Sequence, residues 1–214
     1  MDPIAIGVIV LIRGVYQLWK ESQEKQQNIS NSYNSQKPVI IKKQIVFVGK
    51  TNSGKSTTAN ALCGAQFQVG PTHGVTQTVE SFRYEDFGYN VVDTPGILDT
   101  TDYAPQIHGI VAESEIVVFV TTGQMYQQEY DFFKRLSSTR NKDVQTLITF
   151  INKNDIKRTT QTMHEIMAER QLIREQAQGY CDEIVFGAAA PMYDGQRQKA
   201  DIDALSRSIR LRLK

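Results

Sequence analysis

A glycine-rich segment follows the first β-branched, apolar run of the chain. Gly49, Gly54, Lys55 and Ser56 fit the pattern Gly-x4-Gly-Lys-Ser, which wraps the phosphates of a nucleoside triphosphate. The glycines let the loop curl with its backbone N–H groups inward, and the helix that begins near Lys55 adds its positive end. Lys55 supplies charge to the β- and γ-phosphates, and the Ser56 hydroxyl binds magnesium (Mg²⁺). We therefore expect phosphate contacts along the whole loop, from Lys50, Thr51, Asn52, Ser53, Gly54, Lys55, Ser56 and Thr57.

A second candidate for metal and phosphate chemistry is the segment Asp-Thr-Pro-Gly, which begins at Asp93 and ends at Gly96. The aspartate can hold Mg²⁺ through a water, and the Gly96 N–H can bond the γ-phosphate, so that the loop beyond senses hydrolysis. A mobile threonine between the two motifs should complete the metal site. We choose Thr76, because Gly74 gives the backbone before it freedom to move. Thr78 stays open as the alternative.

The third motif is Asn152-Lys153-x-Asp155, which follows another apolar run. A carboxylate can accept from both N1–H and the exocyclic amine of guanine, whereas adenine presents an acceptor at N1, so Asp155 selects GTP over ATP. Asn152 would hold its loop against the phosphate loop, and the Lys153 stem would lie over the base. Backbone N–H groups of Ala188 and Ala189 could meet the guanine carbonyl oxygen. An ATPase stays open as the alternative.

The elements that position these motifs alternate along the chain. Apolar or β-branched runs predict strands over residues 39–48, 80–84, 89–93, 115–121, 146–152 and 183–186. Helical spacing predicts helices over residues 55–63, 128–136, 162–178 and 202–213. Strands that alternate with helices indicate an α/β fold of three layers, with a mostly parallel six-stranded sheet and one antiparallel edge strand. Ligands of such sheets bind at the carboxyl ends of the strands, where all three motifs fall.

The N-terminal part of the chain is separate in character. Residues 1–20 are strongly apolar but are interrupted by Arg13, and three interpretations stay open. They could form a membrane anchor, an amphipathic helix that packs on a partner, or a helix docked on the protein's own domain. Residues 21–38 are rich in Gln, Asn and Ser and predict a flexible linker. Residues 39–214 are the predicted nucleotide-binding domain.

The net charge indicates which partners the protein can bind, and the cysteine count indicates the redox state of its compartment. A formal net charge of +1 lacks the concentrated basic surface that nucleic-acid binding needs, so we expect no nucleic-acid partner. Cys63 and Cys181 are too few for a disulfide framework and suit a reducing compartment. We therefore predict a cytoplasmic protein, with membrane association through residues 1–20 as an open possibility.

Together, the motifs within residues 44–190 resemble the TRAFAC class of P-loop GTPases, most of all Era-like proteins and their single-domain bacterial relatives. Immunity-associated and septin-like GTPases are the second choice. Ile97 stands where Ras-like members hold a Gln that orients the attacking water, so the resemblance implies slow hydrolysis that depends on dimerisation or a partner. Asn52 matches an Asn that helps to hold potassium (K⁺) in some members. The Thr-Thr-Arg-Asp and Ser-Ala-Lys runs of the family are absent, and no RNA-binding module is expected after Lys214.

The sequence thus predicts a slow GTPase switch whose loops close on Mg²⁺-GTP and open after hydrolysis. The expected catalytic residues are Lys55, Thr76 and Gly96, and the expected metal ligands are Ser56, Thr76 and Asp93. A homodimer formed through the switch face is one expected source of activation. The alternative from another class is a nucleotide-dependent scaffold that assembles on a membrane with little turnover.

Overall fold

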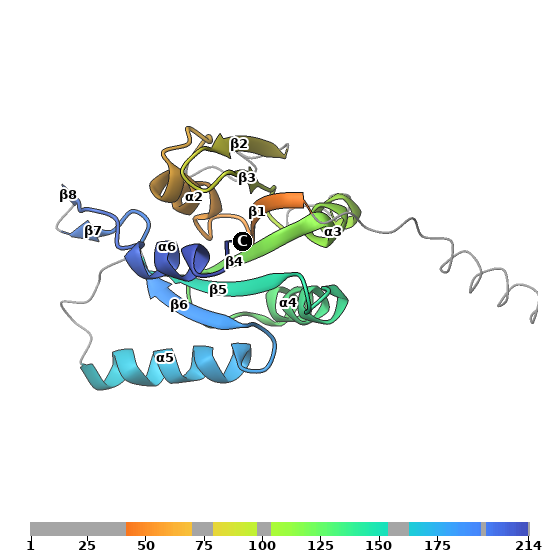
Figure 1. Ribbon diagram of the computed structural model, residues 1–214. Coiled ribbons are helices and arrows are strands. Elements are labelled where there is room, and N and C mark those ends of the chain that lie inside the picture. Colours follow the sequence, from red (N-terminus) through yellow and green to blue (C-terminus); the bar gives the residue numbers. More distant parts are fainter. Residues whose placement is uncertain (1–41, 70–78, 98–103, 154–162, 194–195, 214) are drawn as a thin grey trace, which may run out of the picture. The chain divides into compact units, whose positions relative to one another are not determined.

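A six-stranded sheet forms the centre of the computed structural model, which describes residues 42–69, 79–97, 104–153, 163–193 and 196–213. The strands lie in the order β2-β3-β1-β4-β5-β6 (Figure 1). Their bounds are β1 (Lys42–Val48), β2 (Glu80–Tyr84), β3 (Tyr89–Asp93), β4 (Ser114–Thr121), β5 (Thr146–Asn152) and β6 (Glu183–Gly187). Neighbouring strands are parallel except at the edge, where β2 runs antiparallel to β3. The predicted α/β fold, with one antiparallel edge strand, is confirmed.

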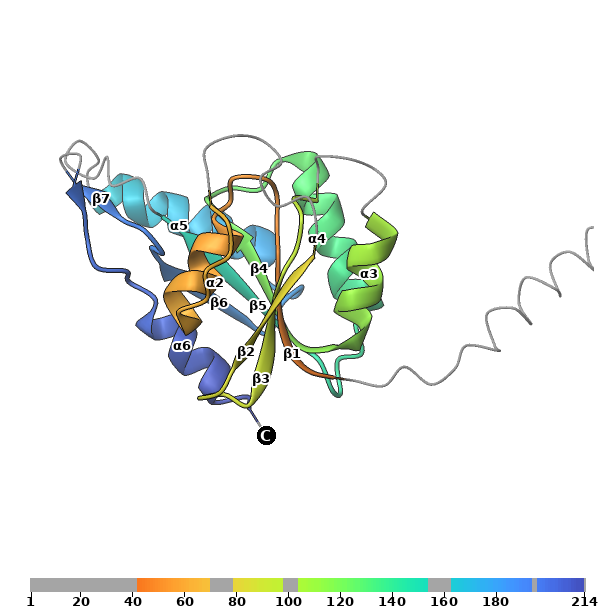
Figure 2. The ribbon, with the colours of Figure 1, turned by 90° about the horizontal axis from the view of Figure 1, so that it is seen from above.

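Helices cover both faces of this sheet. Their bounds are α2 (Lys55–Cys63), α3 (Ala104–Glu113), α4 (Gln127–Thr139), α5 (Met163–Ala177) and α6 (Asp203–Arg210). Helices α2 and α6 pack on one face, and α3 and α4 pack on the other (Figure 2). Helix α5 joins the second group through Ala177. The central strand β1 is therefore apolar on both sides: Ile45 and Phe47 face the first pair of helices, and Val46 and Val48 face the second group.

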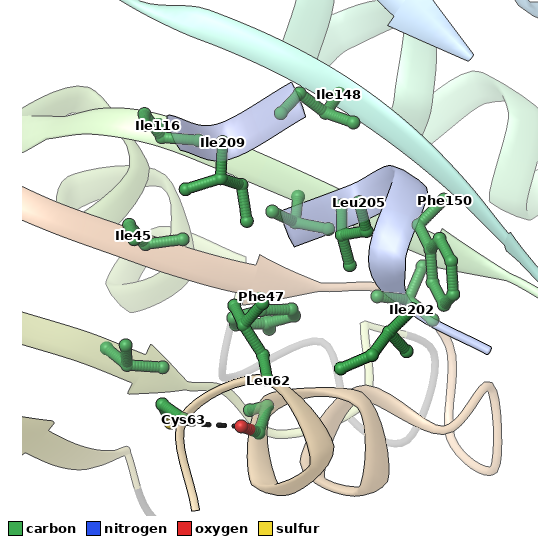
Figure 3. Close-up of a cluster of buried hydrophobic side chains, with 14 of the residues drawn as sticks. Ile45, Phe47, Leu62, Cys63, Ile116, Ile148, Phe150, Ile202, Leu205 and Ile209 are labelled. Atoms are coloured by element: carbon green, nitrogen blue, oxygen red, sulfur yellow. Dashed lines mark hydrogen bonds between the residues drawn. The ribbon is translucent and has the colours of Figure 1, made fainter. Parts of the chain in front are cut away.

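The core between the sheet and α2 and α6 explains the apolar spacing near the C-terminus. Leu205 and Ile209 of α6 are fully buried against Ile45 and Phe47 of β1 (Figure 3). Each such side chain contributes about 1.5–3 kcal/mol through burial, which holds the short helix on the sheet. At the end of α2 the chain turns at Gly64, which adopts a left-handed φ of 66° as the helix C-cap.

Two parts of the fold were not predicted from the sequence. Helix α3 contains Pro105 and Gly109, which lower helix propensity, but Ile107 and Val111 lie one turn apart and are buried in the core. Packing therefore outweighs propensity there. The second is a small two-stranded sheet, in which β7 (Met192–Tyr193) pairs antiparallel with β8 (Gln196–Arg197).

The N-terminal predictions concern residues 1–20 and 21–38, which lie outside the described residues. The division of the chain into those segments and a domain over 39–214 stays a prediction. None of the helices within the described ranges combines the length and the apolar composition that crossing a membrane requires.

Candidate functional site

The loop between β1 and α2 is held close to the neighbouring strand β4. A Cβ atom at Gly49 would lie 2.2 Å from the carbonyl oxygen of Val120, so only glycine fits there. Gly54, the residue before α2, has a left-handed φ of 88°. Asn52 is the single non-glycine residue with positive φ among the described residues, at 61°. Asparagine tolerates this conformation well, so a tight turn accounts for Asn52 independently of any K⁺.

Two donors of this loop, one of them the ammonium of a buried lysine, converge on the carbonyl of Lys50. Lys55 is only 6% exposed, and its ammonium donates to the carbonyl of Lys50 at 3.1 Å. The Ser53 N–H donates to the same carbonyl at 3.2 Å. The Ser53 hydroxyl is buried with no hydrogen-bond partner within the described ranges. A buried cation and an unsatisfied donor in the same loop favour an anionic ligand.

Asp93 at the end of β3 lies next to the start of α2. The Ser56 hydroxyl donates to its Oδ2, whereas Oδ1 is buried with no hydrogen-bond partner among the residues that the structure describes. Burial raises the pKa of Asp93 to about 6, against the opposing effects of the Ser56 hydrogen bond and the Lys55 charge. A hydroxyl and a carboxylate oxygen that lacks a partner are donors that suit Mg²⁺. The side chains of Ser56 and Asp93 therefore fit a magnesium ion.

The segment after Asp93 is fixed to the phosphate loop. The Thr94 hydroxyl donates to the carbonyl of Phe47 at 2.9 Å. The Ile97 N–H donates to the carbonyl of Gly49 at 3.2 Å, which ties the Gly96–Ile97 peptide to the first residue of the loop. The Ile97 side chain is buried in the core that faces α3 and α4. Its packing role was not predicted from the sequence, where Ile97 stood out only as a residue that cannot orient water.

Asn152, at the end of β5, forms hydrogen bonds to the phosphate loop and to the loop after β6. Its side-chain amide donates to the carbonyl of Ser53 at 3.0 Å, as expected for a residue that holds its loop against the phosphate loop. Its Oδ1 accepts from the Ala189 N–H at 2.9 Å, and the Ala188 N–H donates to Asp201 at 2.9 Å. The two N–H groups expected to donate to guanine therefore already donate within the protein, because buried N–H groups need partners. They close the loop after β6 instead.

Lys153 has a partner that the sequence did not suggest. Its ammonium forms an ion pair with Glu169 of α5. A Cβ at Gly123 would lie 3.1 Å from this ammonium, so a glycine after β4 leaves room for it. Nothing in the spacing of Glu169 along α5 distinguishes it from the other charged residues of that helix. Only the packing of α5 beside the end of β5 reveals the contact.

Three residues proposed from the sequence for the metal site or the base cannot be placed. Thr76, its alternative Thr78, and Asp155 lie outside the described residues. The described part of the chain does bring the phosphate loop, Asp93, Gly96 and Asn152 together at the carboxyl ends of β1, β3 and β5. Parallel α/β sheets bind their ligands at this edge.

Comparison with known proteins identifies the family. Residues 44–174 match the family described as 50S ribosome-binding GTPase. The chain belongs to this family of GTPases. The chain is 30% identical over 146 residues to GTPase Der of Synechococcus sp. (strain WH7803), and the aligned region covers 63% of this chain and 31% of Der. It is 24% identical over 164 residues to the tRNA modification GTPase MnmE of Borrelia turicatae, and this aligned region covers 69% of this chain and 33% of MnmE.

A further relative and a solved structure are also similar to this chain. A 62-residue segment is 42% identical to Immune-associated nucleotide-binding protein 3 of Arabidopsis thaliana, covering 27% of this chain and 19% of that protein. A bacterial selenocysteine-specific elongation factor, EF-Sec, shares the fold with a TM-score of 0.52 and 16% identity, over 81% of this chain and 29% of that structure. The resemblance to TRAFAC-class GTPases is confirmed, and the chain carries a GTP-binding P-loop domain. It spans about a third of the length of the GTPases Der and MnmE.

Proposed function

We propose that this site binds GTP and GDP with Mg²⁺, that the protein hydrolyses GTP slowly, and that it acts as a molecular switch. The observation that carries the proposal is the buried oxygen Oδ1 of Asp93, which has no hydrogen-bond partner among the described residues and lies beside Ser56 and Lys55. Such a group costs free energy unless a cation or donor satisfies it. A Mg²⁺–nucleotide complex supplies the cation.

The residues of the chain have distinct parts in this proposal. The backbone N–H groups from Lys50 to Thr57 and the N-terminus of α2 bind the phosphates, and Lys55 stabilises the charge that develops on them. Ser56 and Asp93 hold Mg²⁺, which neutralises phosphate charge when bound. Gly96 donates its N–H to the γ-phosphate, and Thr76 completes the closed state. The peptide after Gly96 is bonded to Gly49, so movement at the γ-phosphate would reach the segment beyond Ile97.

The base end supports guanine as the ligand. Asn152 fixes the loop that carries Lys153 and Asp155 onto the phosphate loop. Asp155 would accept from guanine, and the stem of Lys153 would lie over the base. Exchange of Asp155 for Asn should shift the preference from guanine to xanthine nucleotides, since the amide offers a donor where the carboxylate accepted. A variant that keeps its affinity for GDP and does not bind XDP would refute this assignment.

Slow hydrolysis follows from the place of Ile97. Its side chain is buried in the core and carries no polar group, so it cannot orient a water at the γ-phosphate. We therefore propose that activation comes from elsewhere, by a homodimer formed through the switch face or by K⁺ held near Asn52. Turnover per molecule that stays constant from low to high protein concentration would exclude activation by a dimer. Equal rates in potassium and sodium buffers would exclude Asn52 from catalysis.

The apolar side chain at Ile97 also supports a second candidate function. A site that binds GTP but lacks a water-orienting side chain at Ile97 also suits a nucleotide-dependent scaffold, assembled on a membrane through residues 1–20. Single-turnover assays separate the two proposals. Phosphate release after GTP binding supports the switch, whereas tight GTP binding without release, together with sedimentation of the full chain with vesicles, supports the scaffold.

A further inference from the structure

A fully buried carboxylate lies next to the phosphate loop and has no part in the site as described above. Glu129 stands in the first turn of α4 and has no exposed surface. Neither of its carboxylate oxygens has a hydrogen-bond partner among the described residues. The ammonium of Lys50 lies 3.4 Å from its Oε2. Lys50 is the residue that directly follows Gly49 in the loop.

The pair of Glu129 and Lys50 contributes little to the stability of the core. Removal of a carboxylate from water costs several kcal/mol, and the attraction within a buried ion pair offsets that cost only in part. The positive end of α4 offsets some of the cost, because Glu129 lies in its first turn. Phe132 and Phe133 already supply the apolar packing of this helix. The pair therefore calls for an explanation other than the stability of the core.

The position of Lys50 supplies that explanation. Its carbonyl oxygen accepts both the Lys55 ammonium at 3.1 Å and the Ser53 N–H at 3.2 Å. Lys50 thus contacts Glu129 through its side chain and Lys55 through its backbone carbonyl. The Lys50 ammonium also lies 5.4 Å from the centre of the Tyr126 ring, so two groups at the start of α4 attract it.

The start of α4 is itself fixed in place. Met125, which precedes the helix, is 3% exposed. Its N–H donates to Oε1 of Gln176 at 2.9 Å, and its carbonyl accepts from Nε2 of Gln176 at 3.1 Å. This reciprocal pair of hydrogen bonds joins the start of α4 to α5. Glu129 therefore projects from a fixed support and can define where Lys50 lies.

We propose that Glu129 is a positioning residue for the phosphate loop. By holding the Lys50 side chain, it fixes the Lys50 carbonyl and so the position of the Lys55 ammonium, which sets the affinity for the phosphates of the nucleotide. The inference rests on the proposed function of the site. It adds a contact from α4 that none of the three sequence motifs contains.

A double-mutant cycle tests this inference on the full chain, with the affinity for Mg²⁺-GDP measured by calorimetry. Glu129→Gln keeps the shape of the side chain and removes its charge, and Lys50→Met removes the partner. Each change should weaken binding about three- to tenfold, and the double variant should bind no more weakly than either single variant. Lys50→Arg should bind more tightly than Lys50→Met, because its cationic side chain can still pair with Glu129.

The matched control lies on the same helix. Asp131→Asn disrupts an exposed pair with Lys134 at 2.9 Å and should leave the affinity unchanged. A merely structural role for Glu129 would lower the melting temperature of the nucleotide-free protein and leave the affinity of the folded protein as it was. That result, or additive losses in the double variant, would overturn the inference.

Folding and the proposed function are checked separately. If Glu129→Gln does not fold, the comparison of Lys50→Met with Lys50→Arg carries the test: weaker binding by the methionine variant alone supports the inference, and equal binding by both overturns it. If the wild-type chain does not bind GDP, the proposed function fails, and the inference fails with it. Wild-type binding that all the variants retain contradicts only the inference.

Discussion

The base end and the phosphate end of the site differ in how their polar groups are satisfied. At the base end, Asn152 donates to Ser53 at 3.0 Å and accepts from Ala189 at 2.9 Å, so both functions of its amide are used. At the phosphate end, Asp93 Oδ1 and the Ser53 hydroxyl are buried without a hydrogen-bond partner in the described part of the chain. Among the described residues, the polar groups of the base end are satisfied within the protein. The phosphate end holds groups that a ligand can satisfy.

This difference indicates a division of labour. Groups that already have protein partners fix geometry, and they contribute to affinity by reducing the ordering that binding requires. Buried groups without partners contribute directly, because the ligand removes a cost that the free protein bears. Changes at Asn152 should therefore act mainly on the stability of the free protein, and changes at the phosphate end mainly on nucleotide affinity.

The largest effect is expected from Lys55→Ala. This change removes the charge that we assign to the β- and γ-phosphates and should weaken GDP binding by at least about 100-fold. Calorimetry of GDP binding measures the loss. Lys142→Ala, on the surface, is the control and should bind as the wild type does. A Lys55→Ala variant within threefold of wild-type affinity would contradict the assignment of this loop to the phosphates.

Asn152→Ala should instead act mainly on the stability of the nucleotide-free protein. The change leaves the Ser53 carbonyl and the Ala189 N–H without their partner, at a cost of about 2–4 kcal/mol in the free energy of unfolding of the nucleotide-free protein. Urea unfolding measures this loss, and Asn90→Ala, at an exposed position of β3, should change the free energy by less than about 0.5 kcal/mol. Unchanged stability would show that the base end is not the fixed part of the site.

Asp93 adds a dependence on pH at the phosphate end. Burial raises its pKa from 3.8 to about 6, so the folded nucleotide-free protein binds a proton that the unfolded chain has already lost between these two values. The stability of the nucleotide-free protein should therefore fall as the pH rises from about 4 to 6, by up to about 3 kcal/mol from this group. Asp93→Asn should remove that part of the slope and also abolish the gain in GDP affinity from Mg²⁺. Identical pH profiles for the wild type and the variant, each measured by urea unfolding, would contradict the assignment.

The smallest effect is expected at the pair of Lys153 and Glu169. Both side chains are partly exposed, so water screens the pair, and Glu169→Gln should change GDP affinity by no more than about threefold. Glu175→Gln, on the exposed side of the same helix, is the control. A tenfold loss in Glu169→Gln alone would show that the described part of the base end contributes directly to affinity, and the contrast between the two ends would then weaken.

The sequence predicted the parts of the site that lie within short motifs, and it missed those that arise from packing between distant segments. Lys55, Asp93 and Asn152 are recognisable because each lies at or shortly after the end of a strand, at a fixed spacing from its motif partners. Glu169 carries no such pattern, since it lies on a helix and meets the site only after α5 packs on the sheet. Helix α3 was missed for the same reason: burial of Ile107 and Val111 outweighs its weak helix propensity.

The roles of Ala188 and Ala189 show the same limit. Their place after the last strand of the sheet suggested contact with the base, but a β-bridge to Asp201 and the hydrogen bond to Asn152 use their N–H groups. Backbone donors in a loop cannot be assigned to a ligand until the protein acceptors around them are known. Those acceptors come from parts of the chain that the motif does not contain.

A titration of the full chain with GDP and with ADP, each with and without Mg²⁺, tests the central claim most directly. We predict that GDP binds at least about 100-fold more tightly than ADP, because a guanine-specific site leaves the polar edge of adenine unpaired. Removal of Mg²⁺ should weaken GDP binding in the wild type but not in Asp93→Asn. Equal affinity for the two nucleotides, or GDP binding that does not respond to Mg²⁺, would contradict the account.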